Sequence, residues 1–564
     1  MELIETTLLV VLAVALVGAL SRRLPVPLPM LLVAAGVVLS YAPGLRDVEL
    51  EPSVFFLLFI PPLLFSDAWL FPKREFFQLR YSILLLAFGL VFATTLVVGY
   101  VVHWLIPSIP LAAAFALGAI VSPTDAVAVS EITHKLKLPH RLTAVLNGES
   151  LVNDASGLVA FKFAVAAVVT GAFSFADAAG SFVLLAGGGV IVGLGVALVV
   201  QSLRHWLQRT GMEEPSVQIA LSLLTPFAAY LAAEAVHVSG VLAVVAAGLY
   251  AGSDDNRHLT LQTRLSAWTV WETVLFLLNG AVFLLLGLEL RRVLAGIADR
   301  SWGDLALYAL IVSGTVIVVR LLWMYPGARL AYVLNRRHAP NLPPPGPRGV
   351  FIAAWAGVRG AVTLAGALSL PLMAGDGPFP ERGLLIFLAT SVILVTLALN
   401  GLSLPLLIRV LGIRDDGELA REERSARIEL AHAAVDALRT RLDYQQDAVD
   451  RDFTLDLIRR YERRALHDAG AEDADTRDAA SRIGTERDLR LAALAAERER
   501  LAALRDARRI NESVLFTLQR ELDLEEATLH ASGARAGVRG EAAVLPDVAA
   551  SGKRVGRRAR ELQS

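Results

Sequence analysis

The sequence predicts an all-α polytopic membrane protein with about 13 transmembrane helices, inverted repeats and a C-terminal helical cytoplasmic region. Three observations lead to this fold class. Hydrophobic residues make up 55% of the 564 residues, and the mean hydropathy is +0.55. They form long runs up to about Ile413, and the chain beyond is charged and helix-forming, as in "GELAREERSARIEL". We therefore expect a transmembrane domain at 1–412, a cytoplasmic helical region at 413–530, and a tail at 531–564 with a composition typical of disorder.

A bilayer crossing needs about 20 mostly apolar residues, which is the basis for counting spans. The first span, Thr6 to Leu20, follows Glu2 and Glu5 rather than positive charge, and no small-residue cleavage site follows it, so we expect it to be retained. The expected crossings are centred near residues 12, 35, 60, 93, 120, 157, 189, 226, 246, 279, 317, 361 and 397.

The lysines and arginines of the loops predict the orientation. The odd-numbered loops contain 16 of them and the even-numbered loops 5. The positive-inside rule then places the odd loops in the cytoplasm and the N-terminus outside. An odd number of crossings also leaves the charged C-terminal region in the cytoplasm, so the two deductions agree. We expect a multi-pass protein of the cell membrane, surrounded by the lipid bilayer.

The overall charge and the cysteine content exclude little else. With 53 basic and 54 acidic residues the net charge indicates no partner, and no nucleic acid is expected. The chain has no cysteine, so disulfides, thiol catalysis and cysteine-ligated metals are excluded. We expect no cofactor.

Ionisable residues inside the predicted spans are the main functional signal. Such residues face a bundle interior or a wet cavity, and they are functional candidates by default, although helix–helix contact is the alternative for any one of them. Lys162 is also inside a span, and there we expect snorkelling or a structural pair. Glu234 and Glu272 lie near span ends and are assigned no role. The four acids and two arginines that favour function are Asp67, Asp125, Glu149, Asp154, Arg320 and Arg359.

The sixth span contains "NGESLVNDASG", in which polar residues fall on two neighbouring helix faces. Glu149 and Asn153 are four residues apart and share one face, and Ser150 and Asp154 share the next. The second face offers a hydroxyl and a carboxylate, which suit a hard cation such as Na+ or K+. The first face presents an acid that needs a cationic partner.

The fifth span contains "SPTDAVAV", where Pro123 interrupts a helix. Its ring leaves the carbonyl of Ala119 without a helical donor. Broken backbone at membrane depth survives only beside protein or a water-filled cavity. Freed carbonyls there can coordinate a cation, which is how secondary transporters build midplane sites. Thr124 and Asp125 lie at this break, and a simple proline kink is the weaker alternative.

The twelfth span contains "GVRGAVTLAGALSLP", a second interrupted segment with Gly357 and Gly360 on either side of Arg359. It lies seven crossings after the fifth span. An odd offset reverses the orientation, as an inverted-topology repeat requires.

The motifs "PPLLFSDAW", "AIVSPTDAVAV", "NGESLVNDASG" and "GVRGAVTLAGALSLP" resemble, in order and spacing, the monovalent cation:proton antiporter-1 family. This family includes bacterial NhaP-type sodium/proton antiporters and animal sodium/proton exchangers. The resemblance covers residues 1 to 412. It implies an NhaA-like antiporter fold with crossed broken helices, and a homodimer.

The resemblance also implies roles for single residues. Asp154 matches the carboxylate that alternately holds a cation and a proton, and Asn153 matches its neighbour. A Na+ ion would be held by Asp154, Ser150, Thr124 and Asp67. Asp125 would cap the crossed half-helices, and Glu149 would pair with Arg359, with Arg320 as the alternative. Electrogenic relatives carry two adjacent aspartates where this chain has Asn153 and Asp154, so we expect exchange without net charge movement.

The leading hypothesis is therefore a secondary antiporter that exchanges Na+, or K+ or Li+, for H+, with no enzyme activity. The alternative is a proton-coupled solute carrier, which would need groups fitted to an organic substrate. An intramembrane protease is disfavoured because the GxGD and GxSG signatures are absent. Nothing resembles the selectivity-filter repeat of a channel.

Overall fold

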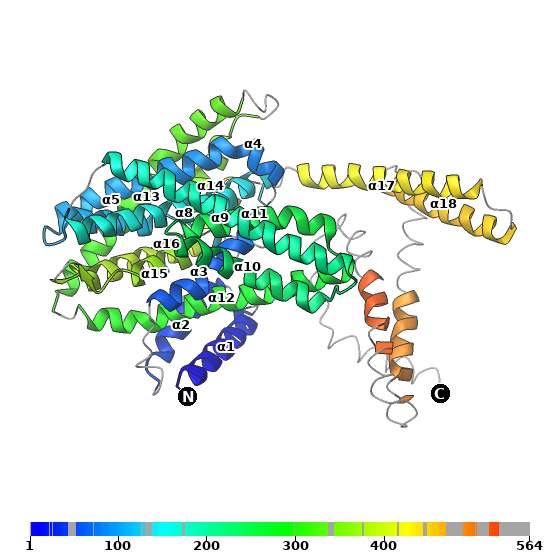
Figure 1. Ribbon diagram of the computed structural model, residues 1–564, viewed down its shortest axis with the longest axis horizontal. Coiled ribbons are helices and arrows are strands. Elements are labelled where there is room, and N and C mark those ends of the chain that lie inside the picture. Colours follow the sequence, from blue (N-terminus) through cyan, green and yellow to red (C-terminus); the bar gives the residue numbers. More distant parts are fainter. Residues whose placement is uncertain are drawn as a thin grey trace. The chain divides into compact units, whose positions relative to one another are not determined.

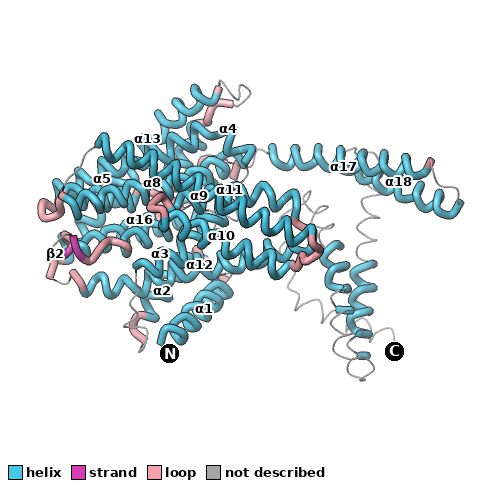
Figure 2. The backbone as a smooth tube through the Cα atoms, in the orientation of Figure 1, coloured by secondary structure: helices cyan, strands magenta, loops and turns pink. Residues whose placement is uncertain are grey.

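The structure is a computed structural model that describes most of the chain. It describes residues 2–469 except 22, 25, 43–51, 72, 126–127, 130–137, 172–174, 298, 337–342, 375–376, 414–416 and 444–447, together with 489–501, 503–504, 518–519 and 521–529. The described residues are almost all helical (Figure 2). The chain separates into two compact units, Met1–Asp416 and Gly417–Ser564.

The first unit is a bundle of apolar helices, and every expected span centre lies within one of them. Within the described residues, seven helical segments are long and apolar enough to cross a membrane alone, and five more apolar helices are shorter. The all-α polytopic fold is confirmed, while the number of crossings remains a prediction. The helices are α1 (Glu2–Ser21), α2 (Leu28–Leu39), α3 (Pro52–Leu70), α4 (Lys73–Leu84), the π-helix η1 (Leu85–Leu90), α5 (Val91–Leu105), α6 (Leu111–Val121), α8 (His140–Thr170), α9 (Phe175–Arg209), α10 (Pro215–Ala235), α11 (Gly240–His258), α12 (Leu261–Ala295), α13 (Trp302–Asn335), α14 (Pro347–Trp355), α15 (Ala361–Leu368) and α16 (Arg382–Val410).

One short antiparallel ribbon interrupts the helices of the first unit. Strands β1 (Met373–Ala374) and β2 (Gly377–Pro378) pair with Met373 opposite Pro378. The ribbon connects α15 to α16 (Figure 2).

Two broken helices cross inside this bundle. The first is broken after α6, which ends at Val121. Residues 128–129 are helical again. The second break separates α14 from α15 at residues 356–360. The two breaks bond to each other, because the Asp125 amide donates to the Val358 carbonyl at 2.8 Å and Arg359 Nε donates to the Val121 carbonyl at 3.0 Å. The predicted crossing of two interrupted segments is confirmed.

The π-helix η1 contributes to the placement of α8. A π-helix widens the backbone ladder for one turn, and such turns are frequent at functional sites. The Ser156 hydroxyl of α8 donates to the Ala87 carbonyl within η1. Because Ser156 follows Asp154 by about half a helical turn, this hydrogen bond holds α8 against η1 close to Asp154.

The second unit contains two packed charged helices, α17 (Glu418–Leu442) and α18 (Ala448–Ala469), which run side by side (Figure 1). Val435 and Ile458 are buried, and Arg439 pairs with Glu462 at 2.7 Å. Residues 521–529 are helical, and the tail expected at 531–564 lies outside the described residues. The expected charged helices are present after the membrane part, while the boundaries of this region and its location in the cytoplasm remain predictions.

Candidate cation site

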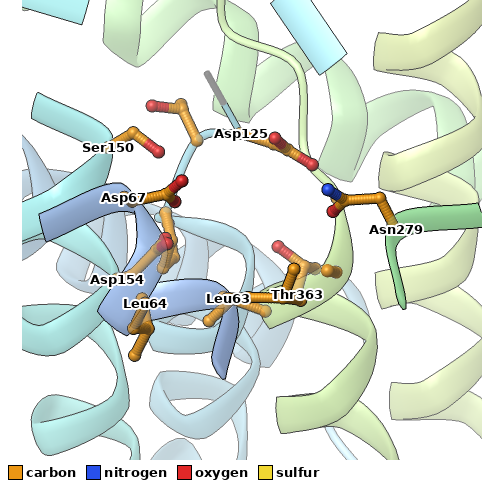
Figure 3. A pocket seen from close by; sticks show the side chains of 13 residues that line it. Leu63, Leu64, Asp67, Asp125, Ser150, Asp154, Asn279 and Thr363 are labelled. Carbon is orange, nitrogen blue, oxygen red and sulfur yellow. The ribbon is translucent and has the colours of Figure 1, made fainter. Parts of the chain in front are cut away.

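A small cavity lies where α3, α8, α12 and α15 surround the break that follows α6 (Figure 3). Its volume is about 30 Å³ for the centres of water-sized spheres. One water needs about 10–15 Å³ on that measure, so the cavity has room for a small ion with a water molecule. The lining residues are Leu63, Leu64, Asp67, Pro123, Thr124, Asp125, Ser150, Asp154, Asn279 and Gly360 to Thr363.

Oxygen atoms from four separate elements meet in this cavity. Asp67 comes from α3, Ser150 and Asp154 from one face of α8, and Asp125 from the first break. In Figure 3, Asp67 and Asp154 lie on one side of the space, and the Asn279 amide lies across from them. Carboxylate, hydroxyl and amide oxygens are ligands for hard cations. The structure thus brings together four of the five residues expected to bind the cation or proton: Asp67, Thr124, Ser150 and Asp154.

Asn153, the fifth, does not line the cavity. Its Nδ2 donates to the Thr124 hydroxyl at 2.9 Å, and that hydroxyl donates to Glu149 Oε1 at 3.2 Å. The expected placement of Asn153 in the cation shell is therefore not what the structure shows. The reason is helical geometry: Asn153 shares a face with Glu149, while Ser150 and Asp154 share the face toward the cavity. Asn153 instead fixes the orientation of Thr124.

Glu149 forms a buried ion pair with Arg320 of α13. Arg320 Nη1 contacts Glu149 Oε1, Nη2 donates to Oε2 at 2.9 Å, and both side chains are at most 1% exposed. The same guanidinium donates to the carbonyls of Ala353 at 3.0 Å and Ala354 at 3.1 Å. These carbonyls belong to the C-terminal end of α14, where the helix dipole favours a cation. Arg320 thus neutralises the Glu149 carboxylate and bonds the carbonyls at the C-terminal end of α14.

The expected pair of Glu149 with Arg359 is wrong, and the alternative partner Arg320 takes its place. Arg359 lies in the second break and donates to the backbone carbonyls of Val121 and Gly357. Its own amide donates to the Thr396 hydroxyl at 3.2 Å. Arg359 therefore neutralises the carbonyl end of α6, because that end is left open by the break. Among the described residues, its Nη2 has no hydrogen-bond partner.

The carbonyls freed by Pro123 are bonded by protein donors. Ser122 Oγ donates to the Ala119 carbonyl at 2.9 Å, and Arg359 bonds the Val121 carbonyl. Each of these two carbonyls thus has a protein donor in this structure, and the expectation that they coordinate the cation stays a prediction. A Cβ on Gly157 would meet Pro123 Cγ at 2.5 Å, so glycine at that position lets α8 approach the break.

Asp125 connects the two breaks. Its Oδ1 accepts from the Ala128 amide at 3.0 Å, which is the geometry of a helix N-cap. A Cβ on Gly360 would lie 1.8 Å from Asp125 Oδ2, so the carboxylate occupies the space that glycine leaves at the start of α15. The predicted capping role has this geometric support, and Asp125 also faces the cavity.

Two lining residues escaped the analysis of the sequence, Thr363 and Asn279. The Thr363 hydroxyl is buried and, within the described part of the chain, has no hydrogen-bond partner. Asn279 lies in the apolar middle of α12, in the stretch "VLFLLNGAVFLLLGL". Both are neutral, and a search for charges inside spans passes over them. The signal that could have found Thr363 is its place in the broken twelfth span.

Comparison with known proteins identifies the family. The sodium/hydrogen exchanger transmembrane family model matches residues 10–410. The chain belongs to this family. The predicted resemblance is confirmed, and with it the expectation of a membrane antiporter for a monovalent cation and protons.

Two relatives carry the same name, sodium, potassium, lithium and rubidium/H(+) antiporter. The one from Bacillus pumilus (strain SAFR-032) is 40% identical over 526 residues, covering 92% of this exchanger and 77% of the relative. The one from Bacillus subtilis (strain 168) is 43% identical over 414 residues, covering 72% and 62%. The solved sodium proton antiporter MjNhaP1 from Methanocaldococcus jannaschii at pH 8 matches with a TM-score of 0.58 and 19% identity, covering 73% of this chain and all of MjNhaP1. That match shows a shared fold.

Proposed function

We propose that this exchanger carries Na+ in one direction and H+ in the other, with K+ and Li+ as further substrates, and that the exchange moves no net charge. The observation that carries the proposal is the position of Asp154 in a small cavity among other oxygen donors, beside a neutral Asn153 that faces away. The relatives named for sodium, potassium, lithium and rubidium support a monovalent cation.

Competition for one carboxylate is sufficient for exchange. A cation at Asp154 and a proton on Asp154 exclude each other, because both need the same negative charge. Ser150, Thr124 and Asp67 then complete the oxygen shell of a partly dehydrated cation, together with the Thr363 hydroxyl and the Asn279 amide oxygen. If the site changes sides only when Asp154 carries a cation or a proton, each cation carried across in one direction is matched by one proton carried back in the other. Lower pH therefore weakens apparent cation binding.

We assign charge balance to the neutral residue beside Asp154, with the Asp67 carboxylate keeping one charge state throughout the cycle. A second aspartate there would bring a second titratable group to the cycle. The chain has Asn153 instead, and its amide bonds Thr124 rather than a transported ion. One positive charge then leaves for each that enters, and a membrane potential does no net work on the cycle.

The size of the cavity argues against the alternative, a proton-coupled solute carrier. Ligand pockets for organic molecules typically measure about 300–1,000 Å³. The cavity at Asp154 is far smaller, at about 30 Å³. It therefore suits an ion better than a metabolite.

The proposal includes the setting of the protein. We place the exchanger in the cell membrane with its N-terminus outside and its C-terminal helices in the cytoplasm, on the strength of the loop charges. We propose a homodimer and a transporter that is no enzyme. The C-terminal helices act as a solvated module that modulates exchange without carrying ions.

Reconstituted vesicles test the proposal. The purified full-length protein is placed in vesicles with an internal pH dye, and Na+, K+ or Li+ is added outside. For Na+ and Li+ a potassium diffusion potential is imposed with valinomycin. We expect cation-dependent proton movement whose rate ignores the imposed voltage. A rate that follows the voltage refutes electroneutral exchange, and cation flux without a proton response refutes exchange itself.

A further inference from the structure

The lining of a second, larger cavity includes an ion pair that the exchange mechanism does not use. The volume of this cavity is about 570 Å³. Lys162 of α8 and Glu234 of α10 both line it, and Lys162 Nζ lies 2.8 Å from Glu234 Oε1. Ionisable residues inside membrane spans are candidates for ion pathways.

Both cavities are lined by residues of α3 and α8. On α8 the lining passes from Asp154 to Leu158, and on α3 from Leu63 to Phe56. At 1.5 Å per residue these steps are about 6 Å and about 10 Å along the helix axes. Thr363 of α15 lines the cation site, and Ser369, the residue directly after α15, lines the larger cavity. From the cation site to the larger cavity, residue numbers rise along α8 and from α15 to Ser369 and fall along α3, as expected when one path runs out toward a single side.

The predicted topology places this side outside the cell. The loop before α8 carries lysines and arginine, so α8 begins in the cytoplasm and ends at Thr170 on the outer side. Lys162 lies in its outer third, and Glu234 lies at the end of α10. The larger cavity therefore lies between the site and the outer solution.

The ion pair spans this path between two helices that both pack on α3. The Lys162 side chain is 51% exposed and that of Glu234 is 39% exposed, so neither is buried. A lysine ammonium is a compact cation on a flexible stem. Its position against Glu234 is where a free cation on its way to Asp154 would find a carboxylate.

We propose that this larger cavity is the outer antechamber of the cation site, and that the Glu234 carboxylate is a cation subsite in it whose place Lys162 holds in this structure. An entering cation displaces the ammonium from Glu234 and then passes between α3 and α8 to Asp154. The proposal rests on the proposed exchange function. A structural ion pair between α8 and α10 is the competing explanation.

The two explanations differ in the sign of single substitutions. If Glu234 is a subsite and Lys162 its competitor, Glu234→Gln raises the apparent KM for cation on the outer face, and Lys162→Gln lowers it. Each change should be about two- to five-fold, as for a partly exposed charge pair. The KM on the inner face should not change. A structural pair would shift both variants the same way, with lower thermal stability.

Right-side-out and everted membrane vesicles of the full-length protein measure the two faces. Glu272→Gln, an exposed acid of α12 outside this cavity, is the matched control. Equal shifts on both faces, or no shift in either variant, overturn the proposal. If wild type and the Glu272→Gln control exchange normally and Glu234→Gln leaves the outer KM unchanged, only the antechamber is refuted. If wild type itself does not exchange, the proposed function fails instead.

The absence of cysteine gives an independent test. The Lys162→Cys/Glu234→Cys variant carries the only two thiols in the chain. We expect a bifunctional methanethiosulfonate to stop exchange, a reductant to restore it, and the same reagent to leave each single-cysteine variant more active than the bridged pair. A membrane-impermeant maleimide should label Cys at 162 in right-side-out vesicles only. Normal exchange by the bridged protein, or labelling only in everted vesicles, overturns the proposal.

Discussion

The Glu149–Arg320 pair allows the most quantitative prediction. In Arg320→Met, Glu149 keeps, of its bonds to described residues, the 3.2 Å bond from Thr124, and the Ala353 and Ala354 carbonyls lose their guanidinium donors. Breaking a buried pair by removing one partner costs about 3–5 kcal/mol, and each orphaned buried group accounts for about 1–3 kcal/mol of such losses. We therefore expect Arg320→Met to fall at the upper end of the first range. Glu149→Gln should cost less, because Arg320 keeps its two carbonyl acceptors.

The double variant Glu149→Gln/Arg320→Met separates pairing from independent effects. Replacing both members of a buried pair is often nearly neutral, so the double variant should recover much of the single losses. The assay is the free energy of unfolding in mixed micelles, by titration with SDS. The control cycle combines Glu149→Gln with Arg359→Met, since Arg359 bonds carbonyls rather than Glu149. Additive losses in the Arg320 cycle, or stronger coupling in the Arg359 cycle, would refute the assignment.

Three further predictions concern the division of the chain, the crossing and the cavity. A chain ending at Asp415 should insert and exchange, because every lining residue precedes it; normal insertion without exchange at any pH would show that the C-terminal helices belong to the transport machinery. Gly360→Ala should destabilise the protein by about 1–3 kcal/mol, since its Cβ would overlap Asp125, whereas Gly349→Ala, with open space around it, should not; equal stabilities would contradict the packing. Thr363→Val should raise the KM for cation about five-fold by removing one hydroxyl ligand, with Thr225→Val as the control; an unchanged KM would remove Thr363 from the site.

The fold could be predicted from the sequence because membrane spans leave a strong one-dimensional signal. Long apolar runs and loop charges locate helices without reference to their neighbours. The two breaks were also predictable, because Pro123 and the glycines around Arg359 interrupt helices by their own covalent structure. These features depend on the local chain alone.

The site was predictable only in part, because partner choice depends on packing. The i, i+4 spacing correctly separates Asp154 and Ser150 from Glu149 and Asn153. Spacing could not tell which arginine reaches Glu149, since both lie in later spans, and it could not show that Ser122 satisfies Ala119. Thr363 and Asn279 are neutral residues that become notable only when the bundle brings them to one cavity.

The central claim is that one carboxylate, Asp154, holds either a proton or a cation, and proton release tests it directly. Na+ is added to purified, weakly buffered protein in detergent, and the protons released are counted against the Na+ bound. We expect about one proton per Na+ from wild type, weaker apparent Na+ binding as pH falls, and no Na+-dependent release from Asp154→Asn with its fold intact. Undiminished proton release from Asp154→Asn would contradict the account.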